Sequence, residues 1–312
     1  MPTRRDLLVA ALALLLLPPV LSALGLGITS ATEVVIFAIA CMALNILVGT
    51  TGLTSFGHGA WFGLGAYAAA MAQRSLFPGS FVTPMAIGLG AVLALAAVFG
   101  FLILRRRGVY FSLLTLALSA MLYSVAFRWT EVTGGENGLT FSQPRLSILG
   151  LWSDRFTPTT FHWFVLAVVV LSYLLVRRIT QSPFGMVLQS IRENEPRTRA
   201  IGYHVERYKI VAVMLSGLFA GLAGVLYAMQ NKFAAPDFVF FLVSGEVVIF
   251  NVMGGVGTLV GPIAGAAFFL LLREGLSRYF EYYLIPVGII FTLMVIFLPQ
   301  GFLGFLRRRL NQ

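Results

Sequence analysis

Long apolar runs that carry almost no charge constrain this chain more than any motif does. The chain of 312 residues has 22 basic and 12 acidic side chains, so charged residues make up 11% of it. An average soluble domain has roughly 25%, and so few charges cannot cover the surface of a soluble protein of this size. A soluble enzyme, a disordered chain and a nucleic-acid-binding protein are therefore excluded, which leaves a polytopic membrane protein.

Cysteine and histidine are too scarce for a disulfide scaffold or a metal centre. Cys41 is the only cysteine, and His58, His162 and His204 lie far apart in the sequence. Structural zinc sites need several such ligands at short spacing. We therefore expect no metal site.

A helix that crosses a bilayer needs about 20 mostly apolar residues. Ten such runs can be traced, at about 7–28, 32–50, 60–73, 81–104, 109–128, 161–178, 208–230, 240–256, 258–276 and 284–305. We read the first as a retained helix, because no clear cleavage site of a signal peptide follows it. The run at 60–73 is too short to cross alone, and we expect it to continue from a broken segment that includes 52–59. The prediction is an all-α membrane protein with one transmembrane domain over residues 1–312 and broken, glycine-rich helices.

Arginine clusters between the apolar runs set the expected orientation. They lie at 4–5, 105–107, 177–178 and 307–309, and basic residues gather on the cytoplasmic side of membrane proteins. Ten crossings place all four clusters and both termini on that side, provided that 240–276 crosses twice.

Two loops are long enough to carry function, an outer one at about 129–160 and a cytoplasmic one at about 179–207. Neither can hold a folded domain, which starts at roughly 50 residues. The only lysines are Lys209 and Lys232, and no glycine-rich phosphate loop with a lysine occurs. If the protein uses ATP, another chain must hydrolyse it.

Two stretches, 45–60 and 251–265, each begin with an asparagine and run into glycines and small polar residues. Paired interrupted helices are the best sequence pointer to a transport site, and backbone groups freed within a membrane must face protein or a water-filled cavity. The candidates for a substrate pathway are Asn45, Thr54, Ser55, His58, Glu246 and Asn251. Close helix packing through Gly59-x-x-x-Gly63 and Gly257-x-x-x-Gly261 is the alternative, and both can hold.

Two of these candidates, Glu246 and His58, and the outer loop allow more than one interpretation. Glu246 lies within an apolar run, where a carboxylate is costly and faces the bundle interior; it either lines the pathway or braces the bundle through a partner that the sequence does not reveal. His58 is either a ligand or an ordinary core histidine. In the outer loop, Gly134, Gly135, Glu136 and Asn137 form a gate, a docking surface or a simple turn.

In the cytoplasmic loop, Phe184, Val187, Leu188 and Ile191 recur at helical spacing and predict a short amphipathic helix with one apolar stripe. Such a helix either lies on lipid or fits a groove on a partner protein. The acids and bases that follow at 192–197 are mixed, which is poor for anionic lipid and favours a protein partner.

Nine segments, in their order and spacing, carry a resemblance to a known family. They are Gly52–Ala60, Gly108–Phe111, Thr115–Ala117, Thr133–Leu139, Ser182–Gly185, Ile191–Glu195, Ala200–Gly202, Gly254–Pro262 and Leu298–Gly301. Over about residues 30–306 the chain resembles the LivM-type permease subunit of branched-chain amino-acid ABC importers.

This resemblance implies a multi-pass protein of the bacterial inner membrane, surrounded by lipid and paired with a second, homologous permease. It also implies two cytoplasmic ATPase subunits, which bind ATP and Mg²⁺, and a periplasmic binding protein; no cofactor is expected on this chain, which is not an enzyme. Residues 184–202 match the helix that couples the permease to its ATPase. The coupling residues would be Phe184, Gly185, Val187, Leu188, Ile191, Arg192, Glu193, Asn194, Glu195 and Gly202.

Several alternatives stay open. Related permeases carry urea, short amides or aromatic acids, and the sequence separates these substrates poorly. A stand-alone channel or a proton-coupled carrier would need no ATPase, and a membrane enzyme would need His58 and Glu246 to meet. Under the coupling hypothesis, Gly185→Trp is expected to abolish uptake while leaving the bundle folded.

Overall fold

The computed structural model describes residues 27–104, 108–142, 145–146, 154–279, 281–297 and 301. The predicted first span at 7–28 and the arginine clusters at 4–5, 105–107 and 307–309 lie almost wholly or wholly outside these residues. The described helices are α2 (Ile28–Asn45), α3 (His58–Met71), α4 (Val82–Ile103), α5 (Val109–Arg128), α6 (Thr130–Thr133), α7 (Pro158–Gln181), α8 (Pro183–Ala200), α9 (Val205–Asn231), α10 (Phe241–Gly254), α11 (Gly261–Ser277) and α12 (Leu284–Phe297).

Short irregular elements extend or join these helices. The π-helical segments η1 (Ile46–Thr51) and η2 (Ala72–Leu76) continue α2 and α3, and the 3-10 turns are η3 (Gly135–Asn137) and η4 (Pro236–Phe238). Strand β1 (Leu139–Thr140) pairs antiparallel with β4 (Phe233–Ala234), and β2 (Arg145–Leu146) pairs antiparallel with β3 (Asp154–Arg155).

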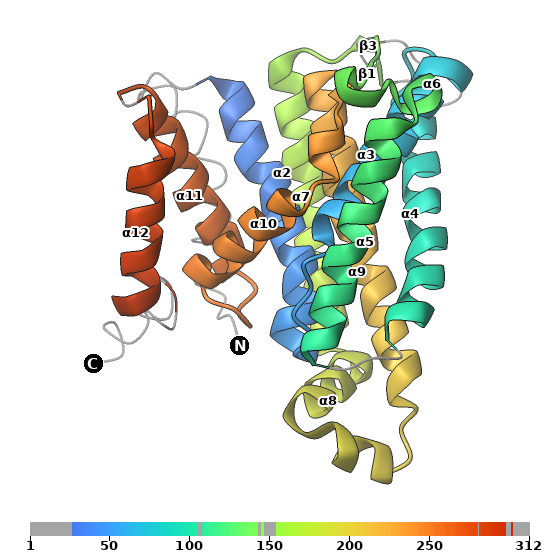
Figure 1. Cartoon of the computed structure of the whole chain (residues 1–312), viewed down its shortest axis with the longest axis vertical. Coiled ribbons are helices and arrows are strands. Elements are labelled where there is room, and N and C mark those ends of the chain that lie inside the picture. Colours follow the sequence, from blue (N-terminus) through green and yellow to red (C-terminus); the bar gives the residue numbers. More distant parts are fainter. Residues whose placement is uncertain are drawn as a thin grey trace.

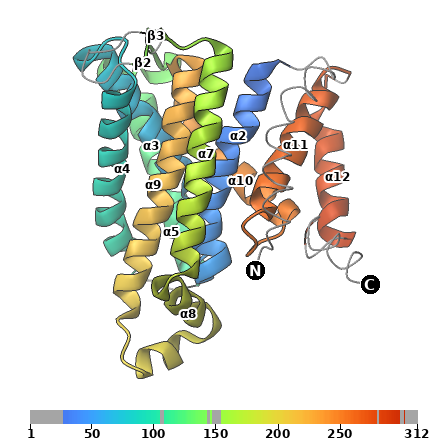
Figure 2. The ribbon, with the colours of Figure 1, turned by 180° about the vertical axis from the view of Figure 1, so that it is seen from behind.

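The long helices run side by side along the height of the molecule (Figure 1). The strands gather at one end of this bundle, the strand end, and α8 lies across the opposite end, the α8 end. Helices α10, α11 and α12 lie on one side of α2, and α3, α4, α5 and α9 lie on the other. Figure 2 shows α7 on the face that Figure 1 hides.

Helix α2 forms the centre of the bundle. Apart from polar residues in its first two turns and Asn45 at its end, it is apolar on every side, and 94% of its most hydrophobic stretch is buried, as expected of a helix without a polar face over that length. It contacts α7, α9, α10 and α11. Rings from Phe37 on α2, Phe62 on α3, Tyr227 on α9 and Phe250 on α10 pack together with centroids 5.5–5.8 Å apart.

Glycines bring several helix backbones into contact. A Cβ on Gly224 of α9 would overlap the carbonyl oxygen of Phe62 on α3, and one on Gly59 would lie 2.6 Å from the carbonyl oxygen of Phe240. A Cβ on Gly265 of α11 would likewise overlap the carbonyl oxygen of Phe250 on α10. The packing interpretation of the glycine-rich stretches is therefore supported, since small residues permit such approach.

Among the described residues, five helical segments are long and apolar enough to cross a membrane: 28–51, α4, α5, α7 and α9. Helices α10 and α12 are apolar but shorter. The predicted all-α, polytopic class agrees with this architecture. Two separate helices, α10 and α11, occupy the stretch 240–276, whereas the count of ten crossings remains a prediction.

Close approach of α3 and α9 makes Gly224 sensitive to one added methyl group. We expect Gly224→Ala to lower the free energy of unfolding by about 1–3 kcal/mol, the usual cost of overpacking. Gly90→Ala on α4 is the matched control, because nothing lies within 4 Å of a Cβ there. Unfolding of the purified protein in mixed detergent, followed by circular dichroism, measures both; equal midpoints would contradict the packing argument.

Candidate functional site

The first interrupted segment, residues 52–57, leaves the helical path between η1 and α3, and hydroxyl groups of α5 bind its backbone. Ser112 Oγ donates to the carbonyl oxygen of Thr54 at 2.7 Å, and Thr115 Oγ1 accepts from the N–H of Phe56 at 3.0 Å. Within a membrane such freed groups need partners from the protein, and α5 supplies them.

The start of α3 is satisfied in the same way by serines of two other helices. The N–H of Gly59 donates to Ser244 Oγ on α10 at 2.7 Å, and that of Ala60 donates to Ser119 Oγ on α5 at 3.2 Å. Both serines are fully buried. The first N–H groups of a helix have no partner within it, so these hydroxyls allow α3 to begin inside the bundle; the N–H of Ala60 also lies 3.1 Å from the carbonyl oxygen of Gly57.

Sequence reasoning did not assign these hydroxyls. The available signal was the spacing of Ser112, Thr115 and Ser119, which recur at intervals of three and four residues and therefore share one face of α5. A face of small hydroxyls beside a glycine-rich break is what a broken membrane helix requires.

His58 is a core residue in this structure. Its Nε2 lies 2.8 Å from Ser216 Oγ on α9, and the Ser216 hydroxyl donates to the carbonyl oxygen of Ala43 on α2 at 2.7 Å. Because that hydroxyl has a single proton, Nε2 must be the donor to Ser216. The partner of Glu246 is Arg273, so the described contacts give no support to an enzyme that joins His58 to Glu246.

The predicted pathway residues differ in exposure. Thr54 is exposed and Glu246 partly so, whereas Asn45, Ser55, His58 and Asn251 are buried, with 1–4% of their surface exposed. Ser55 Oγ accepts from the N–H of Gly57, and Asn251 Nδ2 donates to the carbonyl oxygen of Val247. In this conformation the four side chains are buried, and their place on a pathway remains a prediction.

The two interrupted segments meet at Asn45. Its Nδ2 donates to the carbonyl oxygen of Thr258 at 2.9 Å, and its Oδ1 accepts from the N–H of Gly257 at 2.9 Å. Asn45 ends α2, and residues 255–260 form the turn between α10 and α11. The amide thus joins the end of one broken helix to the turn that follows the other.

Arg273 on α11 is the partner of Glu246. Its Nη1 lies 3.6 Å from Glu246 Oε1 on α10, and its Nη2 lies 2.7 Å from Glu33 Oε1 on α2. One guanidinium thus lies between carboxylates from two other helices, which satisfies the expectation that charges at membrane depth pair with one another. The bracing role of Glu246 is supported, since these contacts tie α10 and α11 to α2.

Helix α8 forms where the sequence predicts an amphipathic helix, but its apolar stripe faces inward. Val187, Leu188 and Ile191 are buried, and the ring of Phe184 stacks on Tyr208 of α9 at 5.5 Å. The expectation that this stripe seats in a partner's groove has no support in this structure and stays a prediction. The chain covers the stripe itself, because α8 packs against α7, α9 and η1.

Gly185 has no room for a larger side chain, since a Cβ would overlap the carbonyl oxygen of Thr180 at the end of α7. This geometry argues against the expectation that Gly185→Trp leaves the bundle folded. The opposite face of α8, with Met186, Gln189 and Glu193, is exposed.

A kink at Asn194 separates the first half of α8 from the second half. Asn194 has φ −157° and ψ 94°, outside the helical region, and its Oδ1 accepts from the N–H of Arg197 as a helix N-cap does. Glu195 Oε2 then binds Nζ of the buried Lys209 on α9 at 2.6 Å. After α8, Gly202 turns the chain with φ +100°.

At the strand end, the predicted outer gate is a tight glycine turn. Gly134 and Gly135 have positive φ, of 76° and 59°, and the turn leads into the pairing of β1 with β4. Glu136 and Asn137 are exposed at its tip. The turn therefore closes the strand end of α5 and presents two polar side chains at the end opposite α8.

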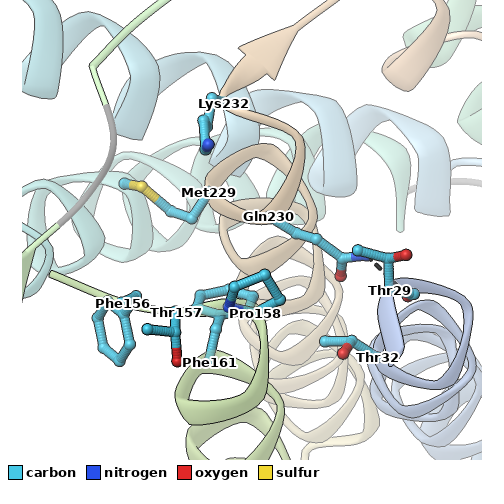
Figure 3. A pocket seen from close by; sticks show the side chains of 9 residues that line it. All are labelled: Thr29, Thr32, Phe156, Thr157, Pro158, Phe161, Met229, Gln230 and Lys232. Carbon is cyan, nitrogen blue, oxygen red and sulfur yellow. Dashed lines mark hydrogen bonds between the residues drawn. The ribbon is translucent and has the colours of Figure 1, made fainter. Parts of the chain in front are cut away.

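Figure 3 shows a separate pocket at the strand end, between the ends of α2, α7 and α9. It has a volume of about 160 Å³, and its lining residues are Thr29, Thr32, Phe156, Thr157, Pro158, Phe161, Met229, Gln230 and Lys232. Gln230 Nε2 donates to the carbonyl oxygen of Thr29 at 2.9 Å. None of the predicted pathway residues lines it.

The comparison with known proteins now decides the family. Residues 27–298 match the family described as the permease component of branched-chain amino acid transport systems. The chain belongs to this permease family. Its members are transport subunits and not enzymes, and the matched range includes both interrupted segments, α8 and the glycine turn at 134–135.

Individual relatives extend this result. The chain is 31% identical to LivM, the high-affinity branched-chain amino acid permease protein of Escherichia coli, over 97% of this chain and 76% of that protein. It is 26% identical to the probable LivM of Methanocaldococcus jannaschii, over 76% of this chain and 72% of that protein. The ribose import permease RbsC of Escherichia coli is 27% identical over 67% of this chain and 66% of that protein. No solved structure matches the chain significantly.

The cap of α3 gives a direct test of the permease's broken helix. We expect Ser244→Ala to lower the free energy of unfolding by about 1–3 kcal/mol, because it leaves the buried N–H of Gly59 without an acceptor. Ser124→Ala on α5 is the control, since the exposed Ser124 hydroxyl bonds only to the carbonyl oxygen of Ala120 in its own helix. The midpoints of detergent unfolding measure the difference, and equal effects of the two substitutions would refute the cap.

The charge cluster of the permease gives a second test. We expect Arg273→Met to lower the free energy of unfolding by about 1–3 kcal/mol, less than for a fully buried pair because these side chains are partly exposed. Adding Glu33→Gln should recover part of this loss, because it removes one unpaired carboxylate. Detergent unfolding of the single and double variants measures this coupling, and strictly additive effects would argue against it.

Proposed function

We propose that this chain is the membrane-spanning permease subunit of an ATP-driven importer for branched-chain amino acids. The match over residues 27–298 carries the proposal, together with the relatives named as LivM. The geometry fits it: two interrupted helices are joined at Asn45 and lie beside α8, which forms a compact element at one end of the bundle. No covalent chemistry is assigned to the chain.

The proposed assembly contains a second homologous permease, two ATPase subunits and a periplasmic binding protein. The chain has no nucleotide-binding loop, so ATP and Mg²⁺ belong to the ATPase subunits, and this chain holds no cofactor. An importer built in this way releases its substrate only after the ATPases change the exposure of the interrupted segments.

Orientation in the bacterial inner membrane follows from charge. Arg177, Arg178, Arg197, Arg199 and Arg207 all belong to the elements at the α8 end, which supports a cytoplasmic position for that end. The strand end then faces the periplasm, where Glu136 and Asn137 are available to the binding protein. Ten crossings with both termini in the cytoplasm agree with this arrangement.

The exposed face of α8 is the proposed ATPase contact. The apolar stripe is covered within the chain, so Met186, Gln189 and Glu193 on the opposite face take the role that sequence reasoning gave to Phe184, Val187, Leu188 and Ile191. The buried stripe then fixes α8 to the bundle, so that a displacement of α8 by the ATPase also displaces the helices that it packs against.

The branched-chain amino acid is the proposed substrate because the family and the LivM relatives carry that description. The relation to RbsC shows that permeases of this kind also occur in a ribose importer, and urea, short amides and aromatic acids are the other candidates. Reconstitution with the co-purified partners in liposomes decides among them. We expect ATP-dependent uptake of labelled leucine, and none by this chain alone; uptake without ATPase subunits would refute the proposal.

The docking face of α8 gives the mutational test. We expect Met186→Asp to reduce co-purification of the ATPase subunits and ATP-dependent uptake about tenfold, because an exposed apolar contact would be replaced by a charge. Leu76→Asp at the opposite end is the control, since Leu76 is 64% exposed and Met186 57%. Equal retention of the ATPase by both variants would show that this face is not the contact.

A further inference from the structure

Arg192 lies in the segment that the resemblance assigns to the ATPase contact; the residue is exposed, but its guanidinium reaches the bundle. Its Nη1 donates to the carbonyl oxygen of Gly49 in η1. The last carbonyl groups of a helix have no partner within it, and a basic side chain is a favourable donor to them. Arg192 therefore joins α8 directly to the place where α2 is interrupted.

The fit around this contact is close on one side and open on the other. Gly52 has φ +74°, and a Cβ there would lie 2.9 Å from Arg192 Cγ, so the arginine stem lies along this glycine. Beside it is a cavity of about 260 Å³, lined in part by Thr51, Glu195 and Lys209. The side chain thus has space to leave Gly49 without displacing the core.

The contact continues beyond η1 to the second interrupted segment. A Cβ on Gly49 would overlap Asn45 Oδ1 and would lie 3.1 Å from Gly257 Cα, so the turn after α10 rests against η1. Asn45 holds that turn through the N–H of Gly257 and the carbonyl oxygen of Thr258. The four residues Arg192, Gly49, Asn45 and Gly257 thus form one chain of contacts, the α8 link.

The π-helical segment η1 is the part of this link that can change conformation. A π turn bonds each N–H five residues back instead of four, is rare, and occurs mostly at functional sites. Conversion of η1 to an α-helix would change the rotation of every residue from Ile46 to the 52–57 segment. Both forms keep most backbone hydrogen bonds, so a single added donor at Gly49 can decide between them.

We propose that Arg192 and Asn45 are positioning residues that transmit a displacement of α8 to both interrupted segments at once. The proposal relies on the proposed function only for the source of motion, which is the ATPase. Glu195 and Lys209 hold the second half of α8 to α9, so the displacement is carried along the Arg192 side of the helix. Withdrawal of Arg192 releases the carbonyl group of Gly49, and the turn at 255–260 follows through Asn45.

A thiol-labelling experiment on the complete complex tests this. Cys41 is the only cysteine of this chain and is buried, so Cys41→Ser with Val256→Cys leaves one cysteine on this chain, in the exposed part of the turn; labelling of this subunit is followed after the subunits are separated by electrophoresis. Labelling rates are measured in lipid nanodiscs with and without ATP plus vanadate. The variants are Arg192→Met, Arg192→Lys, Asn45→Leu and, as control, Arg178→Met, which removes an exposed arginine from the end of α7.

We expect the parent protein to change its labelling rate on adding nucleotide, and Arg192→Met and Asn45→Leu to lose that change. Uptake should fall about tenfold, the factor that one charge-assisted hydrogen bond corresponds to, while ATP hydrolysis continues. Arg192→Lys keeps a charged donor and should restore part of the response, and Arg178→Met should behave as the parent protein. If Asn45→Leu does not fold, the Arg192 series alone decides.

An unchanged nucleotide response in Arg192→Met would overturn the link, and so would the absence of a response in the parent protein. Equal loss in Arg178→Met would also overturn it, because the effect would then belong to any lost arginine at that end. A parent complex that responds to nucleotide but imports no leucine would refute the proposed substrate and leave the link standing.

Discussion

The need of every buried backbone group for a partner within the protein governs this structure. Lipid offers no hydrogen bonds, so a break in a membrane helix is possible only where protein groups or a water-filled cavity take over the lost bonds. Ser112, Thr115 and Ser119 do so from α5 and Ser244 from α10. The break between α2 and α3 is therefore a product of at least three helices, and any motion of α5 or α10 changes how it is held.

The same requirement explains why the few ionic groups lie where they do. Arg273 forms ion pairs with carboxylates from α2 and α10, and Lys209 forms one with Glu195 of α8. The first group ties α10 and α11 to the centre of the bundle, and the second ties α8 to α9. Between them, the link through Arg192 and Asn45 crosses from α8 to the turn after α10. A permease assembled in this way can pass a local displacement across the bundle, since each interrupted helix is held by another element.

Much of the fold was predictable because membrane helices are constrained by composition alone. The spans at 32–50, 81–104, 109–128, 161–178 and 208–230 correspond to α2, α4, α5, α7 and α9. The amphipathic helix at 184–191 was predicted as well, but its burial was not. Period alone shows that a helix has an apolar face; it cannot show whether the same chain or another one covers that face. For the same reason, the sequence could not show whether the side chains of Asn45, Ser55, His58 and Asn251 are buried or exposed.

The sequence by itself determined the class of protein, the places where its helices are interrupted and the family to which it belongs, because hydropathy, glycine spacing and motif order are local properties. Only the tertiary structure decided which partner each polar group has. Glu246 meets Arg273, Asn45 meets Gly257, and Arg192 meets Gly49 across 27, 212 and 143 positions of sequence respectively. Such pairings depend on how the helices pack, and packing is fixed by the whole bundle at once.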